Sequence, residues 1–382
     1  MKEIKNKFKK YIKKEGILYK ILRKIYHILS KLKYKLLNYK DEKKKKLYFS
    51  KRVDEACKIL NMKYKNSDYI ALYNPTWLGV ANSTKGLFEN IVPLEQVFGR
   101  KNIKKISNAI CECNIKSVIF SQIVDGWIEV LREIKRKNEK IKIKVIWHAN
   151  NYEVLSDYTW GLNKKVLELY EEKQIDALAF VKKSMVEFYK KSGYNTFYLM
   201  NNVKTTNTIK RENIKDSKIR IGIYNANSRE LKNIYTQISA TTLIENSIVD
   251  IVPTNEAILE YARIMDLDYT SLPDYIPTEE LLERIKDNDI NLYITFTECS
   301  PMFPIESFES GVPCLIGNNN DYFTNTELEN YVVVSREDDQ EYIKEKILYC
   351  IENKEKIMGL YKKWKQEFDK KTKEYVKEFV EY

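Results

Sequence analysis

The stretch LYITFTECSPMFPIESFESGVPCLIG, residues 292–317, decides the fold of this chain. Its first part, residues 292–297, is apolar, β-branched or aromatic over the length of a buried strand, and Pro301 prevents that strand from continuing. Gly311 then ends a short helix before residues 312–316 resume an extended run. The pattern predicts a strand, a loop, a short helix and a second strand, which is the unit of an α/β sheet.

Two carboxylates frame the predicted loop and helix. Glu298 follows the strand, and Glu306 lies in the first helical turn, for which Ser300 is a candidate cap and Pro301 or Pro304 suits the first position. Carboxylates accept hydrogen bonds from sugar hydroxyls, and a helix N-terminus favours phosphate. The pair therefore fits a sugar nucleotide. For an isolated pair of glutamates, the alternatives are a charge on a loop and a partner of the helix dipole.

Five residues of this stretch stand at the spacing of a known signature. They resemble the E-x7-E motif of retaining glycosyltransferases with the GT-B fold, above all glycosyltransferase family 4: Glu298, Pro301, Glu306, Gly311 and Pro313. The resemblance implies two Rossmann-like domains, a nucleotide-sugar donor bound to the second domain, and no need for a metal ion or other cofactor. It also implies that Glu306 binds the ribose and Glu298 the donor sugar. The loop residues expected beside the donor are Pro301, Met302, Phe303 and Pro304.

Length and composition agree with a two-domain globular protein. The 382 residues exceed one ordinary core, and 43% hydrophobic residues suffice to bury two. Six cysteines include no C-x-x-C pair, and two histidines are too few for a zinc site, so we expect reduced thiols. Because no run of about 18 apolar residues occurs, we expect a cytoplasmic protein without a membrane-spanning helix.

The excess positive charge lies in an N-terminal arm, residues 1–55. Residues 1–50 hold 18 Lys and Arg against 4 Asp and Glu, whereas the rest of the chain is nearly balanced. Apolar residues recur in the arm at helical spacing, which predicts a basic amphipathic helix. Residues 1–46 could bind the anionic inner face of the plasma membrane, or the apolar stripe could pack on a partner or on the enzyme itself. Nucleic-acid binding is not expected, because no matching motif occurs. The stripe consists of Leu18, Leu22, Ile25, Leu29, Leu32 and Leu36.

Strands and helices alternate through residues 56–203, which predicts an N-terminal domain with a parallel sheet. The strands are expected at 69–73, 117–120, 141–147, 176–181 and 196–200, and the helices at 52–60, 87–98, 103–113, 127–136 and 184–191.

Several residues of this domain are candidates for the site. Gly79 lies in a predicted loop that is similar in position to a donor-approaching loop of the resembling family; alternatively it only permits a turn. His148 follows strand 141–147, where open α/β sheets place ligand groups, although a lone histidine can also be structural. The resemblance implies that His148 bonds to the transferred sugar or a phosphate. The polar stretch that follows, with Asp157 and Tyr158, is expected to line the acceptor side.

A polar linker, residues 204–217, precedes the donor-nucleotide domain, 218–352, and a helical tail, 353–382, expected to cross back onto the first domain. In the second domain, Lys232 before a predicted helix is similar to the phosphate-binding lysine of the resembling family, and Arg229 lies nearby. Either side chain can neutralise a diphosphate, or both can belong to a solvated helix start.

One acidic triplet of the second domain could suggest a metal site. Asp266 and Asp268 form a D-x-D triplet that is interpreted as chance, because no matching context surrounds it.

The sequence predicts a retaining, metal-independent glycosyltransferase acting on a glycan or lipid-linked acceptor. The diphosphate leaving group would accept the acceptor proton, as the resemblance implies, so no protein nucleophile is required. Two alternatives remain open at this point. One is a sugar-nucleotide epimerase or phosphorylase of related fold, and the other is a non-catalytic membrane adaptor.

Overall fold

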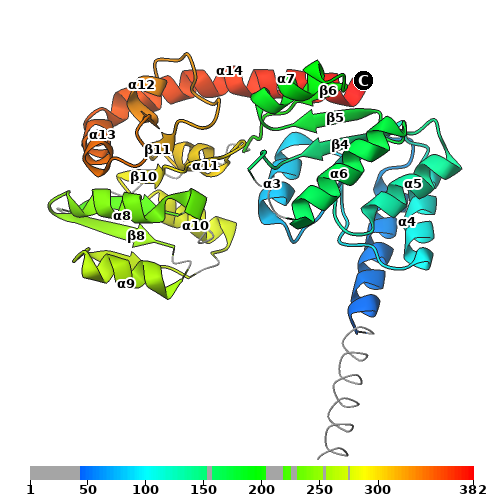
Figure 1. The fold of residues 1–382 in the computed structure, drawn as a ribbon, viewed down its shortest axis with the longest axis horizontal. Helices are drawn as coiled ribbons and strands as arrows, with labels where there is room; N and C mark the ends of the chain where they lie inside the picture. Colours follow the sequence, from blue (N-terminus) through cyan, green and yellow to red (C-terminus); the bar gives the residue numbers. More distant parts are fainter. Residues whose placement is uncertain (1–43, 153–156, 204–217, 225–229, 253–254, 274–275) are drawn as a thin grey trace, which may run out of the picture.

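The computed structural model describes residues 44–152, 157–203, 218–224, 230–252, 255–273 and 276–382. They form two α/β domains, and a long C-terminal helix runs from the second domain back to the first (Figure 1). The predicted basic helix before residue 44 and the predicted linker 204–217 lie outside the described residues. A helix over residues 44–63 leads into the first domain across the predicted boundary at residue 55. No described helix is both long and apolar enough to cross a membrane.

The first domain is built on a six-stranded parallel sheet of order β2-β1-β3-β4-β5-β6. Every residue of the central β3 is buried, so helices cover both faces, as parallel sheets require. Its strands are β1 (Tyr69–Tyr73), β2 (Ile91–Pro93), β3 (Ser117–Ser121), β4 (Lys142–Trp147), β5 (Ala177–Phe180) and β6 (Thr196–Tyr198). Its helices are α3 (Leu78–Leu87), α4 (Arg100–Glu112), α5 (Trp127–Lys137), α6 (Asp157–Glu171) and α7 (Lys183–Lys191).

The second domain repeats this plan with a parallel sheet of order β12-β11-β10-β7-β8-β9. Its strands are β7 (Ile219–Ile223), β8 (Ser247–Ile251), β9 (Tyr269–Ser271), β10 (Ile290–Tyr293), β11 (Cys314–Gly317) and β12 (Val333–Val334). Its helices are η2 (Glu230–Lys232), α8 (Ile234–Thr242), α9 (Glu256–Ile264), α10 (Thr278–Ile285), α11 (Phe303–Glu309), α12 (Glu329–Val332) and α13 (Gln340–Glu352). The prediction of two Rossmann-like domains in the GT-B arrangement is confirmed.

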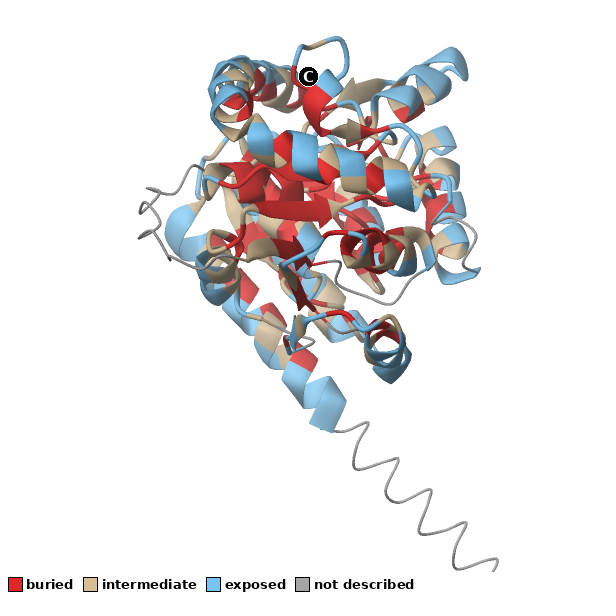
Figure 2. Ribbon diagram, turned by 90° about the vertical axis from the view of Figure 1, so that its left-hand side faces the viewer, coloured by how far each residue is buried: buried red, intermediate tan, exposed pale blue. Residues whose placement is uncertain are grey.

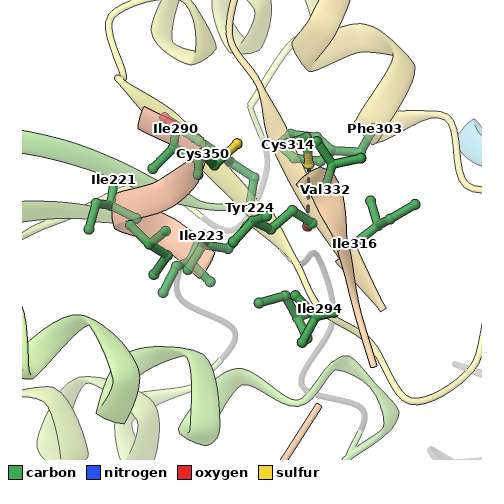
Figure 3. Close-up of a cluster of buried hydrophobic side chains, with 14 of the residues drawn as sticks. Ile221, Ile223, Tyr224, Ile290, Ile294, Phe303, Cys314, Ile316, Val332 and Cys350 are labelled. Carbon is green, nitrogen blue, oxygen red and sulfur yellow. Dashed lines mark hydrogen bonds between the residues drawn. The ribbon is translucent and has the colours of Figure 1, made fainter. Parts of the chain in front are cut away.

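Each sheet carries its own apolar core. In Figure 2 the buried residues gather in the strands at the centre of the molecule, and the outer helices show mostly exposed residues. In the second domain, isoleucines of β7, β10 and β11 meet Phe303 of α11, and Figure 3 shows this cluster. A buried polar network also joins β10 to α11, because Asn291 Nδ2 donates to Ser307 Oγ at 2.8 Å. Ser307 Oγ in turn donates to the Val312 carbonyl. The motif stretch is therefore fixed from inside the domain.

The predicted crossing of the tail is confirmed by α14 (Lys354–Glu381), which ends on the first sheet (Figure 1). Lys144 of β4 is fully buried, and its Nζ donates to the carbonyls of Phe379 at 2.7 Å and Val380 at 2.9 Å. Burial lowers the pKa of Lys144 to about 8. A lysine inside the sheet thus caps the end of α14, where free carbonyls favour a cation.

Several segments differ from their predicted structure. The helix expected at residues 87–98 is wrong, since α3 ends at Leu87 and β2 follows. The apolar pattern misses α3 because its buried face includes two polar residues, Ser83 and Thr84. The Ser83 hydroxyl donates to the Asn201 side chain, and the Thr84 hydroxyl donates to the Val80 carbonyl. The polar stretch after His148 that is predicted to line the acceptor side is helical from Asp157, in α6.

The strand expected at residues 292–297 ends earlier, at Tyr293. The Ile294 N–H donates to the Gln237 side chain, and the Phe296 N–H donates to the Leu231 carbonyl. The chain therefore leaves the sheet before the motif loop begins.

Candidate active site

The structure brings Lys232 and Glu298 together at the end of β10. Lys232 Nζ lies 2.5 Å from Glu298 Oε1 and donates to the Tyr293 hydroxyl at 2.8 Å. Both charged side chains are largely buried, with 9% and 15% of their surfaces exposed. Burial of an ion pair costs desolvation free energy, so the pair is weak evidence for stability and is a candidate for a functional role.

Gln237 holds the backbone around Lys232. Its buried side chain donates to the carbonyls of Lys232 at 2.9 Å and Asn233 at 3.0 Å, and it accepts from the Ile294 N–H at 3.1 Å. Asn233 has a φ of 52°, in the left-handed region that asparagine tolerates better than most residues. One glutamine therefore ties the start of α8 to the end of β10 and fixes the position of the cation.

Glu306 lies in the first turn of α11, as predicted, and its N–H donates to the Met302 carbonyl. Its side chain is half-buried, and no hydrogen bond or ion pair reaches its carboxylate from the described part of the chain. Burial raises the pKa of Glu306 to about 7. Burial also raises the pKa of Tyr322, and the charges of Glu298 and Glu306 add to that increase.

The other motif residues build the support of this loop. Pro301, Phe303 and Pro304 are buried, and Met302 is half-buried at the helix start. The Phe303 ring stacks on Tyr293 with centroids 5.5 Å apart. Contact of these four residues with a donor stays a prediction.

Ser300 does not cap α11, contrary to expectation. Met302 occupies the cap position, whereas Ser300 Oγ accepts from the Asn201 N–H at 3.1 Å. The serine hydroxyl therefore joins the two domains instead of satisfying the helix terminus.

His148 follows β4 on the first-domain side, as predicted. Its ring Nε2 lies 2.9 Å from Ser121 Oγ, and its backbone N–H donates to Gln122 Oε1 at 3.0 Å. Gln122 has a φ of 64°, a left-handed conformation that is uncommon outside glycine and concentrates at functional sites. Burial lowers the pKa of His148 to about 4, so the ring is neutral at physiological pH.

Three first-domain residues that sequence reasoning missed hold the motif loop. Lys182 Nζ donates to the Glu298 carbonyl at 2.9 Å, and Asn201 Nδ2 donates to the Ser300 carbonyl at 2.8 Å. Asn150 Nδ2 donates to Thr297 Oγ1 at 3.0 Å. A signal was available, because these three residues follow the carboxyl ends of β4, β5 and β6, where α/β sheets place their functional groups. The loop that carries Glu298 is therefore positioned by both domains.

The remaining predicted residues fall elsewhere. Gly79 lies in the first turn of α3, not in a loop, and a Cβ there would meet no atom within 4 Å. Arg229 lies outside the described residues. Asp157 begins α6, and Tyr158 beside it is 47% exposed.

The D-x-D triplet is remote from this site. Asp268 pairs with Lys218 at 2.6 Å beside the amino-terminal ends of β7 and β9. Glu298 lies beyond the carboxyl end of β10, on the opposite side of this parallel sheet. Within the described ranges, no cluster of three or more His, Cys, Asp or Glu residues could hold a metal ion.

Comparison with known proteins finds similarity in structure alone. No protein-family model and no curated protein matches the chain. Among solved structures, a trehalose-6-phosphate synthase, OtsA, is similar with a TM-score of 0.56 and 9% identity, over 82% of this chain and 98% of that one. Alr3699/HepE of Anabaena, in complex with UDP and glucose, has a TM-score of 0.54 and 11% identity, over 82% and 99%.

A third similar structure is a point mutant of TarM from S. aureus, in complex with fondaparinux, α-GlcNAc-glycerol and UDP. Its TM-score is 0.54 at 14% identity, over 72% of this chain and 57% of that one. At such identities the likeness establishes the shared two-domain fold. The activity of this chain has to be argued from its own residues.

Proposed function

We propose that this protein is a retaining, metal-independent glycosyltransferase that moves a sugar from a nucleotide-sugar donor to a cell-surface glycan or lipid-linked acceptor. The observation that carries the proposal is the buried pair of Lys232 and Glu298 at the domain junction, on a loop that leads into the helix with Glu306 in its first turn. A buried cation and two carboxylates on one loop and helix suit a ligand with both phosphates and sugar hydroxyls. Structures of the same fold bound to UDP support the donor class.

Each of the three residues has a distinct role in this proposal. The donor diphosphate faces Lys232, the ribose hydroxyls donate to Glu306, and the hydroxyls of the transferred sugar donate to Glu298. Without a ligand, Glu298 neutralises Lys232. The diphosphate competes for that cation when it binds.

The reaction exchanges one bond at the anomeric carbon. The bond to the diphosphate oxygen breaks, a bond to the acceptor oxygen forms, and the acceptor proton moves to the departing phosphate. Negative charge grows on the leaving group, and Lys232 stabilises it in a site where water is largely excluded. Electrostatic stabilisation of this kind is commonly the largest single contribution to catalysis.

A mass-spectrometric screen tests the proposal. The full chain is incubated in EDTA with a panel of sugar nucleotides and lipid-linked or glycan acceptors. We expect one pair to give an acceptor heavier by one sugar, with release of an equal amount of nucleoside diphosphate. Free sugar or sugar phosphate without a glycosylated acceptor would instead favour the epimerase or phosphorylase.

We further propose that residues 1–46 hold this enzyme on the anionic inner face of the plasma membrane, which would make it a cytoplasmic, peripheral protein. The support is the concentration of positive charge in the arm and its apolar spacing. Full-length protein should co-sediment with vesicles that contain anionic lipid at low salt. Binding should weaken in 1 M salt, where the Debye length is about 3 Å. Protein that ignores acidic vesicles at low salt would contradict this assignment.

A further inference from the structure

Three side chains of the first domain form a continuous hydrogen-bonded chain that ends on His148. Thr84 Oγ1 donates to the Val80 carbonyl at 2.7 Å and lies 2.6 Å from Ser121 Oγ. Ser121 Oγ lies 2.9 Å from His148 Nε2. Thr84 is fully buried and Ser121 almost so, and their bonds join α3, β3 and the residue after β4.

The positions of the protons along this chain follow from counting donors. A carbonyl oxygen only accepts, so the single hydroxyl proton of Thr84 goes to Val80. Ser121 must then donate its proton to Thr84, because two hydroxyl oxygens 2.6 Å apart need one proton between them. Ser121 has no proton left for the imidazole. His148 Nε2 therefore carries the hydrogen and donates it to Ser121.

The other ring nitrogen has the opposite character. Burial lowers the pKa of His148 to about 4, so the imidazole is neutral and Nδ1 carries a lone pair. No described residue donates to Nδ1. A lone pair can accept a hydrogen bond from a hydroxyl but can only repel an anionic phosphate oxygen.

We propose that Thr84 and Ser121 are positioning residues that hold His148 as the Nε2–H tautomer, so that Nδ1 accepts a hydrogen bond from a sugar hydroxyl and not from a phosphate. This assignment rests on the proposed glycosyltransferase function for the identity of the ligand. The tautomer itself does not depend on that function. The Nε2–H tautomer limits the role of His148 to the recognition of neutral hydroxyls.

The tautomer can be observed directly by NMR. Protein labelled with ¹⁵N-histidine contains two imidazoles, and a His27→Asn variant assigns the signals of His148. In the ligand-free wild type between pH 6 and 8, we expect a protonated Nε2 and an unprotonated Nδ1. A spectrum with the hydrogen on Nδ1 would overturn the proposal, whatever the protein catalyses.

Two matched variants test the part of Thr84. Thr84→Val keeps the shape of the side chain but removes the oxygen, so Ser121 can turn its proton toward the ring and the tautomer should shift to Nδ1–H. Thr84→Ser keeps the oxygen and should retain the wild-type spectrum. If Thr84→Val is folded and its spectrum is unchanged, Thr84 does not set the tautomer.

Kinetics then connect the tautomer with transfer. In Thr84→Val we expect kcat/KM to fall about tenfold, the size expected when one hydrogen bond to the substrate is lost, while Thr84→Ser keeps wild-type transfer. A shifted tautomer with unchanged kcat/KM would contradict the recognition of a hydroxyl by Nδ1. If no donor and acceptor pair gives any transfer, the proposed function fails, and the tautomer assignment is still decided by the spectrum.

Discussion

The two sides of the domain junction differ in their chemistry. The second domain contributes charges, from Lys232, Glu298 and Glu306, whereas the first contributes the neutral chain that ends on His148. A nucleotide sugar offers partners to both sides, because its diphosphate is charged and its ribose and sugar carry hydroxyls. We propose that Lys232 binds the diphosphate, that the two carboxylates accept from hydroxyls of the ribose and the transferred sugar, and that the neutral imidazole with its fixed tautomer accepts from a further sugar hydroxyl.

Loss of the buried cation should have the largest effect. Lys232→Met leaves Glu298 without its partner and the leaving diphosphate without compensation. We expect kcat/KM to fall by about 100- to 1000-fold, as for the loss of one electrostatic donor in other active sites. Steady-state transfer measurements check this.

The matched control for that variant is Lys218→Met, which breaks an ion pair at the opposite edge of the same sheet with the same change of charge. It should keep kcat/KM within about twofold, because exposed ion pairs contribute little. Equal losses in the two variants would mean that net charge, and not the site, controls activity.

Removal of the Glu306 carboxylate should have a smaller effect than loss of Lys232. Glu306→Ala should weaken donor binding at least about tenfold, since a hydrogen bond to a charged group contributes about 1.5–3 kcal/mol. Isothermal titration calorimetry measures the affinity. Glu279→Ala is the control, because Glu279 also lies in the first turn of a helix of this domain. A folded Glu306→Ala protein with unchanged affinity would reduce Glu306 to a partner of the helix dipole.

Lys182 sharpens the comparison, because it is a cation of the first domain that bonds to backbone carbonyls of the second. Its Nζ donates to the carbonyls of Glu298 and Asn319. Lys182→Met should therefore lower kcat/KM about tenfold or less, the effect of one hydrogen bond to a charged group partly replaced by water. Lys183→Met, at the exposed neighbouring residue, should have no effect. Equal activity of the two variants would remove Lys182 from the support of the motif loop.

A last expected effect is on stability and not on activity. The pKa of Glu306 is about 7, above its ordinary value of 4.5, so the folded protein binds more protons than the unfolded chain between these values. The contribution of Glu306 to stability must therefore fall as pH rises from about 4.5 to 7 and stay constant above that.

Differential scanning fluorimetry of Glu306→Gln against the wild type measures this contribution. The advantage of the glutamine variant should grow by about 4 °C across the window, because a pKa shift of this size corresponds to about 3 kcal/mol and the entropy of unfolding scales with chain length. A difference that does not change with pH would show that the carboxyl is not desolvated.

The two sides also differ in how far sequence predicts them. Most strands and the positions of Lys232, Glu298, Glu306 and His148 follow from local patterns, because apolar runs and turn residues act over a few neighbours. The row of hydrogen-bonded side chains through Thr84 and Ser121 does not follow from such local patterns. Its members come from three elements, and the polar buried face of α3 hides that helix from an apolar pattern.

The hydrogen bonds between the two domains were also beyond local patterns, because they depend on the tertiary fold. Lys182 and Asn201 meet residues more than 90 positions away in the chain, so only the packing of the two domains brings them together. A charged motif on one loop can be recognised locally, whereas neutral hydrogen-bond chains between elements depend on the tertiary fold.

The central claim is transfer of a sugar at this junction, and proton NMR of a single reaction tests it most directly. The full chain, a nucleotide sugar with an α-linked donor and the matching acceptor are followed in EDTA. We expect a new α-anomeric signal that grows in step with free nucleoside diphosphate and is lost in Lys232→Met but kept in Lys218→Met. A β-anomeric product, a requirement for added metal, or consumption of the donor without a glycosylated acceptor would contradict it.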